Sequence, residues 1–92
     1  MANLGKWQIT NRTYEDLETI INDTLTVGTV YLIQVEGSFY MCRKDTTPDE
    51  NEGFHYRETE KTFLYTHGNT TYYFKKDVLT SNVTINIDEQ ES

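Results

Sequence analysis

The chain has 92 residues, enough for one domain, and only 36% of them are apolar. Seven Tyr, four Phe and one Trp offset this, because each aromatic side chain buries a large area. With 15 Asp and Glu against 8 Lys and Arg, the net charge is −7. This charge argues against a nucleic-acid partner, which needs a basic face, and against docking on an anionic membrane. It suits plain solubility, a basic protein partner or mimicry of a nucleic acid's charge.

Cysteine usage and the N-terminal sequence bear on the compartment. A single cysteine, Cys42, excludes an internal disulfide, so the chain is not a cysteine-stapled secreted scaffold. The N-terminal residues lack the apolar run of a signal peptide, and no window approaches the length of a membrane span. We therefore expect a protein that folds in a cytoplasm.

The N-terminal residues alternate between polar and apolar types. Trp7 and Ile9 alternate with Lys6 and Gln8, which indicates a short strand or an extended arm. We predict an extended N-terminal arm over residues 1–12, which lies on the domain or reaches a neighbour. A single domain is then expected over residues 13–88, followed by a flexible acidic tail over residues 89–92.

The best helix pattern of the chain follows this arm, and it predicts a short N-terminal helix over residues 14–23. Thr13 is a suitable N-cap, and Asp16 stands three residues later, where a capping box places its acid. Apolar residues then recur at spacings of three and four, as on one face of a helix. They are Tyr14, Leu17, Ile20, Ile21 and Leu25.

Residues 29–35 are dense in β-branched and aromatic types, which favour a strand. Glu36-Gly37 follows and predicts a tight turn, because glycine tolerates positive φ. Residues 38–42 then complete a predicted β-hairpin. Both faces of the first strand are largely apolar, so we expect it to be central and covered on both sides.

The rest of the chain predicts more strands. Residues 43–53 contain Pro48 and a run of acids, which favours a loop. His67-Gly68-Asn69 indicates a second hairpin turn. Further strands are expected at residues 54–57, 62–66, 70–74 and 83–88. The predicted fold is therefore α+β, a small antiparallel sheet of about five to six strands with the helix on one face.

Reactive residues are few and scattered. Cys42, His55 and His67 supply the types for a metal or nucleophilic site, but paired ligand spacings such as C-x2-C or H-x3-H are missing. Residues 49–53 resemble a calcium loop only faintly, since the glycine falls at position 5 and not 6. Cys42 also lies in a predicted strand and not at a helix N-terminus, where its pKa would fall. We therefore expect no enzymatic activity, no metal and no cofactor.

The aromatic residues indicate recognition more than chemistry. Neighbouring aromatics in a strand point to opposite faces, so one Tyr set can face a partner while the other enters the core. Tyr gives a large contact area at low entropic cost, which suits recognition, although cross-strand Tyr pairs also simply stabilise sheets. The candidate partner contacts are Trp7, Tyr31, Tyr40, Tyr56, Tyr65 and Tyr73.

The hairpin region carries a resemblance to a known class of protein. Gly28-Thr29-Val30-Tyr31-Leu32-Ile33, a short turn and then Gly37-Ser38-Phe39-Tyr40 resemble modules that recur in bacteriophage head fibres, tail fibres and other virion proteins. The match covers residues 13–44, with Val27 in place of the usual proline and without the tryptophan that follows the second strand. The resemblance implies a non-enzymatic structural or attachment protein, repeated by symmetry on a particle.

Two functions of different class follow from these observations. The first is a phage virion component (head fibre, tail or decoration module) that forms homo-oligomers and contacts a capsid, tail or host protein. It is made in the bacterial cytoplasm, and neither nucleic acid nor a membrane is its partner. The second is a small acidic inhibitor in the host cytoplasm, which occupies a basic or nucleic-acid-binding groove of a host enzyme.

Overall fold

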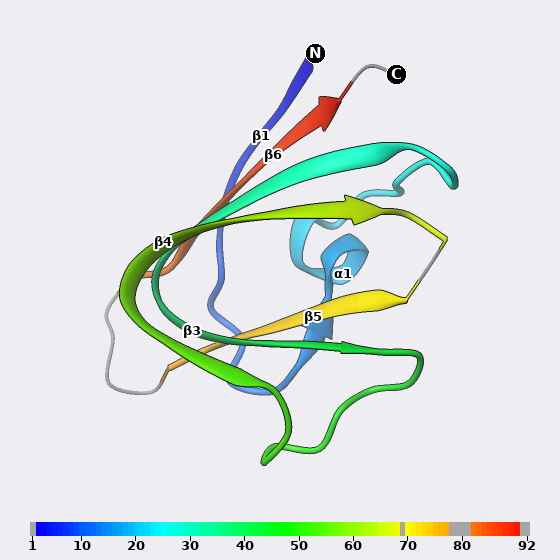
Figure 1. Cartoon of the computed structure of the whole chain (residues 1–92). Coiled ribbons are helices and arrows are strands. Elements are labelled where there is room, and N and C mark those ends of the chain that lie inside the picture. Colours follow the sequence, from blue (N-terminus) through cyan, green and yellow to red (C-terminus); the bar gives the residue numbers. More distant parts are fainter. Residues whose placement is uncertain (1, 69, 78–81, 91–92) are drawn as a thin grey trace.

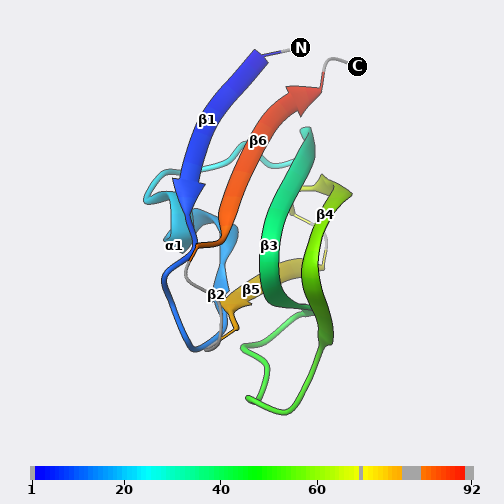
Figure 2. The same ribbon diagram turned by 90° about the vertical axis from the view of Figure 1, so that its left-hand side faces the viewer.

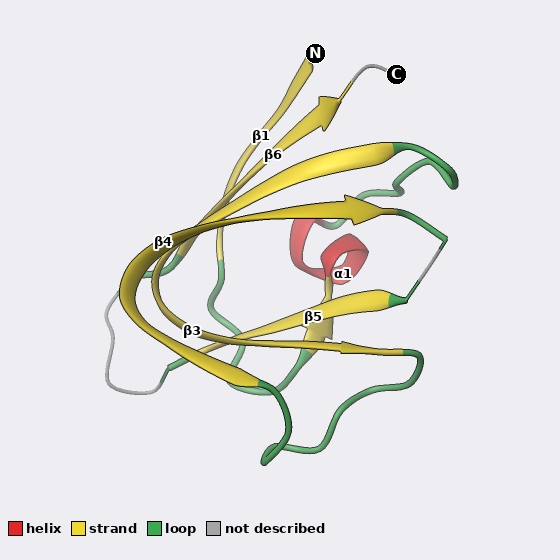
Figure 3. Cartoon of the chain, viewed as in Figure 1, coloured by secondary structure: helices red, strands yellow, loops and turns green. Residues whose placement is uncertain are grey.

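The computed structural model describes residues 2–68, 70–77 and 82–90. In these residues six strands form one antiparallel sheet, which curls into a half-barrel with one short helix on its concave side (Figures 1 and 3). The elements are β1 (Ala2–Gln8), β2 (Glu15–Asp16), α1 (Leu17–Ile21), β3 (Val30–Lys44), β4 (Phe54–Thr66), β5 (Thr71–Lys76) and β6 (Thr84–Gln90). The predicted α+β class, with five to six strands and one short helix, is confirmed.

Strand β3 is the centre of the sheet. Its first half, Val30–Glu36, pairs with β6 on one side and β4 on the other. Its second half, Phe39–Lys44, pairs instead with β5, while β4 follows it as far as Met41. The bent β3–β4 pair thereby joins two leaves, of which the first appears in Figure 2 as β1, β6, β3 and β4 side by side. The expected central position of this strand is confirmed.

The predicted hairpin turn at Glu36-Gly37 is wrong. Gly37 does have a positive φ of 124°, but it lies inside a continuous strand. The register shifts opposite it, because β3 advances two residues from Gly37 to Phe39 while β4 advances three from Thr59 to Tyr56. The extra residue is therefore a bulge in β4, where Glu58 has a positive φ of 42°. A bulge bends a strand and strengthens its twist, so this part of the β3–β4 pair makes the corner between the two leaves. The connection that reverses the chain is the loop of residues 45–53, and β4 is the true partner of β3.

The second predicted hairpin is also corrected. The chain does reverse after β4, where the His67 N–H donates to the Thr29 carbonyl. In the described residues, however, β4 and β5 form no ladder, because they lie on opposite leaves and meet through side chains. Tyr65 packs on Tyr72 with ring centroids 4.9 Å apart, and Phe63 packs edge to face on Phe74 at 5.9 Å. Asn69, the last residue of the predicted turn, lies outside the described residues.

The helix is shorter than the predicted range of residues 14–23. Its N-cap is Asp16, whose carboxylate accepts a hydrogen bond from the Thr19 N–H at 3.0 Å. Glu15 and Asp16 are extended because they pair with Phe74 and Tyr73 of β5. Sheet pairing therefore delays the helix by one turn, and Asp16 serves as the cap in place of Thr13. Asn22, in a left-handed conformation, ends the helix.

The two ends of the chain lie side by side in the sheet. Ala2–Gln8 pairs with β6 along its length. Of the two predictions for the N-terminal residues, a short strand or an extended arm, the strand is therefore the one found over residues 2–8, and this part of the predicted arm belongs to the sheet. Glu89 and Gln90, expected in a flexible tail, belong to β6 and pair with β1 and β3. The last two residues of that predicted tail lie outside the described residues.

The two faces of the curled sheet differ in what covers them. The concave face holds the core, with Tyr31, Ile33 and Val35 of β3 buried against the helix and β6. On the opposite face Val30 and Leu32 are only half-buried, so the expectation that the first half of β3 is covered on both sides is wrong. The core residues are Ile9, Leu17, Ile21, Leu25, Tyr31, Ile33, Val35, Phe39, Met41, Tyr65, Phe74, Val83, Ile85 and Ile87.

Candidate protein-contact surface

Two of the tyrosines proposed as partner contacts belong to the core. Tyr31 is 2% exposed and Tyr65 is 3% exposed. The Tyr31 hydroxyl accepts a hydrogen bond from the Thr26 N–H at 2.8 Å, and the Tyr65 hydroxyl lies 2.8 Å from Nδ1 of His67. Buried Tyr hydroxyls commonly find such a partner. These two side chains therefore hold loops against the core and offer no free surface.

The other four candidates are half-buried and lie apart from one another. Trp7 leans over Gly5 and borders, with the buried Tyr31, a small hollow of about 140 Å³ beside the helix. Tyr56 stacks on Phe39 with ring centroids 5.0 Å apart, above the core. Tyr40 and Tyr73 lie on the second leaf, which the second half of β3 forms with β5 and β2. There Tyr40 stands opposite Lys75, and Tyr73 stands opposite Cys42. The structure thus brings Trp7 and Tyr31 together but does not gather the candidates into one surface.

Sequence reasoning missed the apolar residues that are most exposed on β4. Leu64 is 60% exposed, and Phe54, at the other end of the strand, is 67% exposed. Leu64 stands directly opposite Leu32 of β3, so the two side chains are cross-strand neighbours on the convex face. The alternation of Phe63, Leu64 and Tyr65 carried this signal: with both aromatics in the core, the leucine between them must face outward.

Strand β4 is also an edge of the sheet. Among the described residues it pairs with β3 alone, so its other side has no strand partner. One backbone group of this segment, the Leu64 carbonyl, accepts a hydrogen bond from the Tyr72 hydroxyl at 3.0 Å. Natural edges are often protected by charge, and residues 57–61 supply this with Arg57, Glu58, Glu60 and Lys61. Residues 62–66, by contrast, have no charge. We call the backbone edge of residues 62–66, together with the side chains of Leu64 and Leu32, the β4 contact surface.

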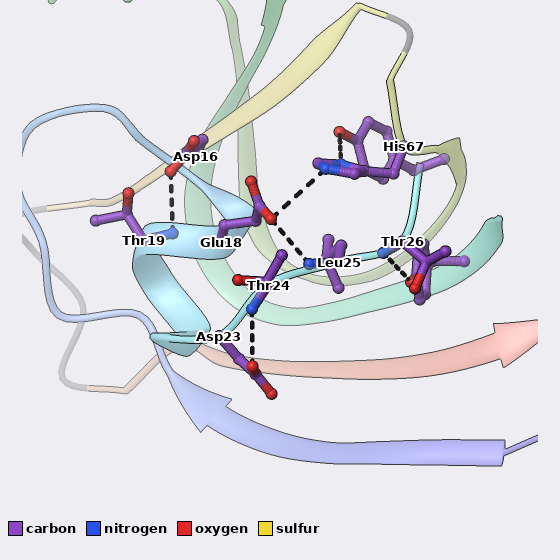
Figure 4. A network of polar contacts seen from close by, with 10 residues as sticks. Asp16, Glu18, Thr19, Asp23, Thr24, Leu25, Thr26 and His67 are labelled. Carbon is purple, nitrogen blue, oxygen red and sulfur yellow. Dashed lines mark hydrogen bonds and ion pairs between the residues drawn. The ribbon is translucent and has the colours of Figure 1, made fainter. Parts of the chain in front are cut away.

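A group of carboxylates surrounds the helix, as Figure 4 shows. Glu18 accepts a hydrogen bond from the Leu25 N–H at 2.8 Å, and its Oε2 lies 3.6 Å from Nε2 of His67. Asp23 accepts one from the Thr24 N–H at 2.8 Å. Together with Asp16 these acids border a shallow hollow of about 490 Å³. Each carboxylate therefore fastens a backbone segment, and the set also forms an acidic face.

A second polar cluster lies on the convex side of the other leaf. Lys75 is only 7% exposed, and its ammonium lies 4.7 Å from the Tyr14 ring centroid and 4.9 Å from that of Tyr40. It donates a hydrogen bond to the Glu50 carbonyl at 2.7 Å, which holds the loop of residues 45–53 against the sheet. His55 stacks on Tyr40 at 4.3 Å.

The three residues with reactive side chains, Cys42, His55 and His67, have different surroundings and do not form one site. Cys42 is buried, and burial followed by the charge of Glu52 raises the pKa of its thiol. His55 Nε2 lies 2.6 Å from the carboxylate of the buried Asp77, and His67 contacts Tyr65 and Glu18. In the described part of the chain, no three His, Cys, Asp or Glu side chains converge as metal ligands would.

Comparisons with known proteins add no relative. No family model, no curated protein and no solved structure matches the chain. None of the helical residues that the structure describes forms a helix long and apolar enough to cross a membrane.

Proposed function

We propose that this chain is a non-enzymatic binding protein that acts through protein–protein contacts at the β4 contact surface. The observation that carries this proposal is the uncharged edge of residues 62–66, which has no second strand partner in the described residues, with Leu64 exposed beside Leu32. The Leu64 carbonyl accepts a hydrogen bond from the Tyr72 hydroxyl at 3.0 Å, which an added strand would have to displace. An extended segment of a partner can continue the sheet along such an edge, with main-chain hydrogen bonds for affinity and side-chain contacts for specificity. Leu64 would then be the apolar anchor.

The form of this function that we favour is a bacteriophage virion component, present in several copies on a head or tail. The resemblance of residues 28–40 to virion modules supports it, although the turn of that pattern is part of a continuous strand in this chain. A small sheet with open edges gains burial from a neighbour, as repeated modules do on a particle. The partner is then a second copy or a capsid or tail protein.

Substitution of Leu64 tests the contact surface. Leu64→Lys places a charge on the edge, which opposes strand addition, and should shift oligomers toward monomer in size-exclusion chromatography with light scattering. If a particle is the partner, the variant should also co-purify with it less than the wild type does. An unchanged mass and unchanged particle binding would overturn the proposal.

The matched control is Phe54→Lys. It adds the same charge to the same strand, at a residue that is equally exposed but lies at the other end of β4. Thermal unfolding of both variants should stay within a degree or two of wild type, since neither side chain is part of the core. Loss of assembly in Leu64→Lys alone would then locate the contact at residues 62–66.

A second candidate function, an acidic inhibitor of a host enzyme, is favoured by the acidic face around the helix. Asp16, Glu18 and Asp23 border one hollow there, and the chain as a whole has a charge of −7. Occupation of a basic groove by such a face weakens steeply as salt rises, because the charges are screened over about 8 Å at physiological ionic strength. A strand-edge contact should respond little. Affinity measured between 50 and 500 mM salt, about tenfold in ionic strength, separates the two functions.

A further inference from the structure

A wide hollow lies between β5, the loop of residues 45–53 and the residues just before β2. It has a volume of about 560 Å³, within the range of small-molecule sites. Its lining comes from segments far apart in the sequence, which the fold brings together. They are Arg12, Thr13, Tyr40, residues 50–53, His55, Lys75 and Lys76.

The charge in and behind this hollow is opposite to that of the molecule. Three of the eight Lys and Arg residues of the chain line it, against two of its fifteen acids. The cations are Arg12, Lys75 and Lys76, and the acids are Glu50 and Glu52. The rest of the sequence has five cations and thirteen acids, so the hollow has an excess of cations in an acidic chain.

Most of these charges are already paired inside the protein. The Lys44 ammonium lies 2.7 Å from the Glu52 carboxylate, and His55 Nε2 lies 2.6 Å from that of Asp77. Lys75 is held between two aromatic rings. Arg12 and Lys76 differ, because neither forms a side-chain hydrogen bond or ion pair with any residue in the described ranges. Arg12 is exposed, and Lys76 is half-buried at the end of β5.

We propose that the hollow binds a small oxyanion, a carboxylate or phosphate group, between Arg12 and Lys76. An Arg fork and a Lys ammonium are the side chains that best hold such groups, by charge-assisted hydrogen bonds. The stacked Tyr40 and His55 rings form an aromatic part of the lining. Glu50 is the acid of the lining without an internal ion pair in the described residues, and it opposes an anion there. This site is separate from the β4 contact surface and does not depend on it.

Nuclear magnetic resonance titration of the full chain tests the site. Inorganic phosphate and citrate are added in separate series, with chloride keeping the ionic strength constant. The expected result is saturable shift changes at the backbone amides of Arg12, Thr13, Asn51 and Lys76. The two series show whether phosphate or carboxylate is preferred. Changes that stay linear, or that match those of chloride alone, would overturn the proposal.

Three variants decide whether the binding belongs to these residues. Arg12→Gln combined with Lys76→Gln should weaken binding by about a hundredfold or more, since each of the two charge-assisted contacts contributes about 1.5 kcal/mol or more. Lys6→Gln, at an exposed lysine of β1 outside the hollow, should leave it unchanged. Glu50→Gln should strengthen binding, because it removes an opposing charge. Equal affinity of wild type, the double variant and Glu50→Gln for phosphate and citrate would refute the site. If the double variant fails to fold, an unchanged affinity of Glu50→Gln refutes the site by itself.

Discussion

Glu18 of the helix and His67 of the turn after β4 lie 3.6 Å apart, from carboxylate Oε2 to Nε2. The same carboxylate oxygen accepts a hydrogen bond from the Leu25 N–H, and Nδ1 of His67 lies 2.8 Å from the Tyr65 hydroxyl. One side chain therefore connects the helix, the segment that follows it and the end of β4 (Figure 4). Because α1 has only five residues, such tertiary contacts must stabilise it where its own hydrogen bonds cannot.

We predict that Glu18→Ala lowers the free energy of unfolding by about 1–2 kcal/mol, because the Leu25 N–H loses its acceptor beside a buried side chain. Glu18→Gln retains an acceptor oxygen and should cost less. Urea denaturation followed by circular dichroism gives both values. Glu15→Ala serves as the control, since the Glu15 side chain forms no hydrogen bond or ion pair with the described residues. Equal stability of Glu18→Ala and the control would contradict this role.

The strands were predictable from local pattern because their side chains alternate. Every second side chain of residues 83–87 points inward, and these side chains, Val83, Ile85 and Ile87, belong to the core, as their spacing indicates. Pairing was less predictable, because it depends on residues distant in the chain. Gly37 has the positive φ that its type suggests, but this conformation occurs both in a tight turn and inside a bent strand. Here β3 continues through Gly37 because β4, with a bulge at Arg57 and Glu58, pairs with it on both sides of the bend.

The candidate surface was the least predictable feature. A tyrosine in a strand faces either core or solvent, and for Tyr31 and Tyr65 the choice depends on a helix and a turn that pack over them. The same packing leaves Leu64 outside. The hollow lined by Arg12 and Lys76 could not be predicted either, since these two residues are 64 positions apart in the sequence and no local spacing links them.

We predict that Gly37→Ala is markedly more destabilising than Gly28→Ala. A Cβ at Gly37 would lie 2.7 Å from the Asn82 carbonyl oxygen and 3.2 Å from the Val83 Cα, so backbone must move. At Gly28, which also has positive φ, a Cβ would meet nothing within 4 Å. Gly28→Ala should therefore cost only the conformational penalty of about 1–2 kcal/mol, and Gly37→Ala at least about 1 kcal/mol more. Thermal unfolding of the two variants measures the difference, and similar melting temperatures would refute the close approach at Gly37.

The raised pKa values of two tyrosines predict that the protein loses stability at alkaline pH. Burial first, and then neighbouring ionisable groups, raises the pKa of Tyr14 and of Tyr65 to about 12, from 10 for an exposed tyrosine. Between pH 10 and 12 the unfolded chain therefore loses protons that the folded chain retains, so stability falls as pH rises. Tyr14→Phe should make this decline shallower, whatever its effect at neutral pH. Urea midpoints measured from pH 8 to 11.5 test the slope, and a decline identical to wild type would contradict the prediction.

The position of Lys75 predicts a stabilising role for a buried cation. Lys75→Met keeps the apolar part of the side chain but removes the ammonium from the Tyr14 and Tyr40 rings and from the Glu50 carbonyl. We expect a loss of about 2 kcal/mol, from the cation–π contacts and one charge-assisted hydrogen bond. Amide exchange at residues 49–53 should also accelerate, because this bond holds their loop. Lys76→Met, at the less buried neighbour, should change neither quantity. Since an uncharged core residue is sometimes better than a buried ion, a more stable Lys75→Met with an unaltered loop would show that the cation does not stabilise the fold.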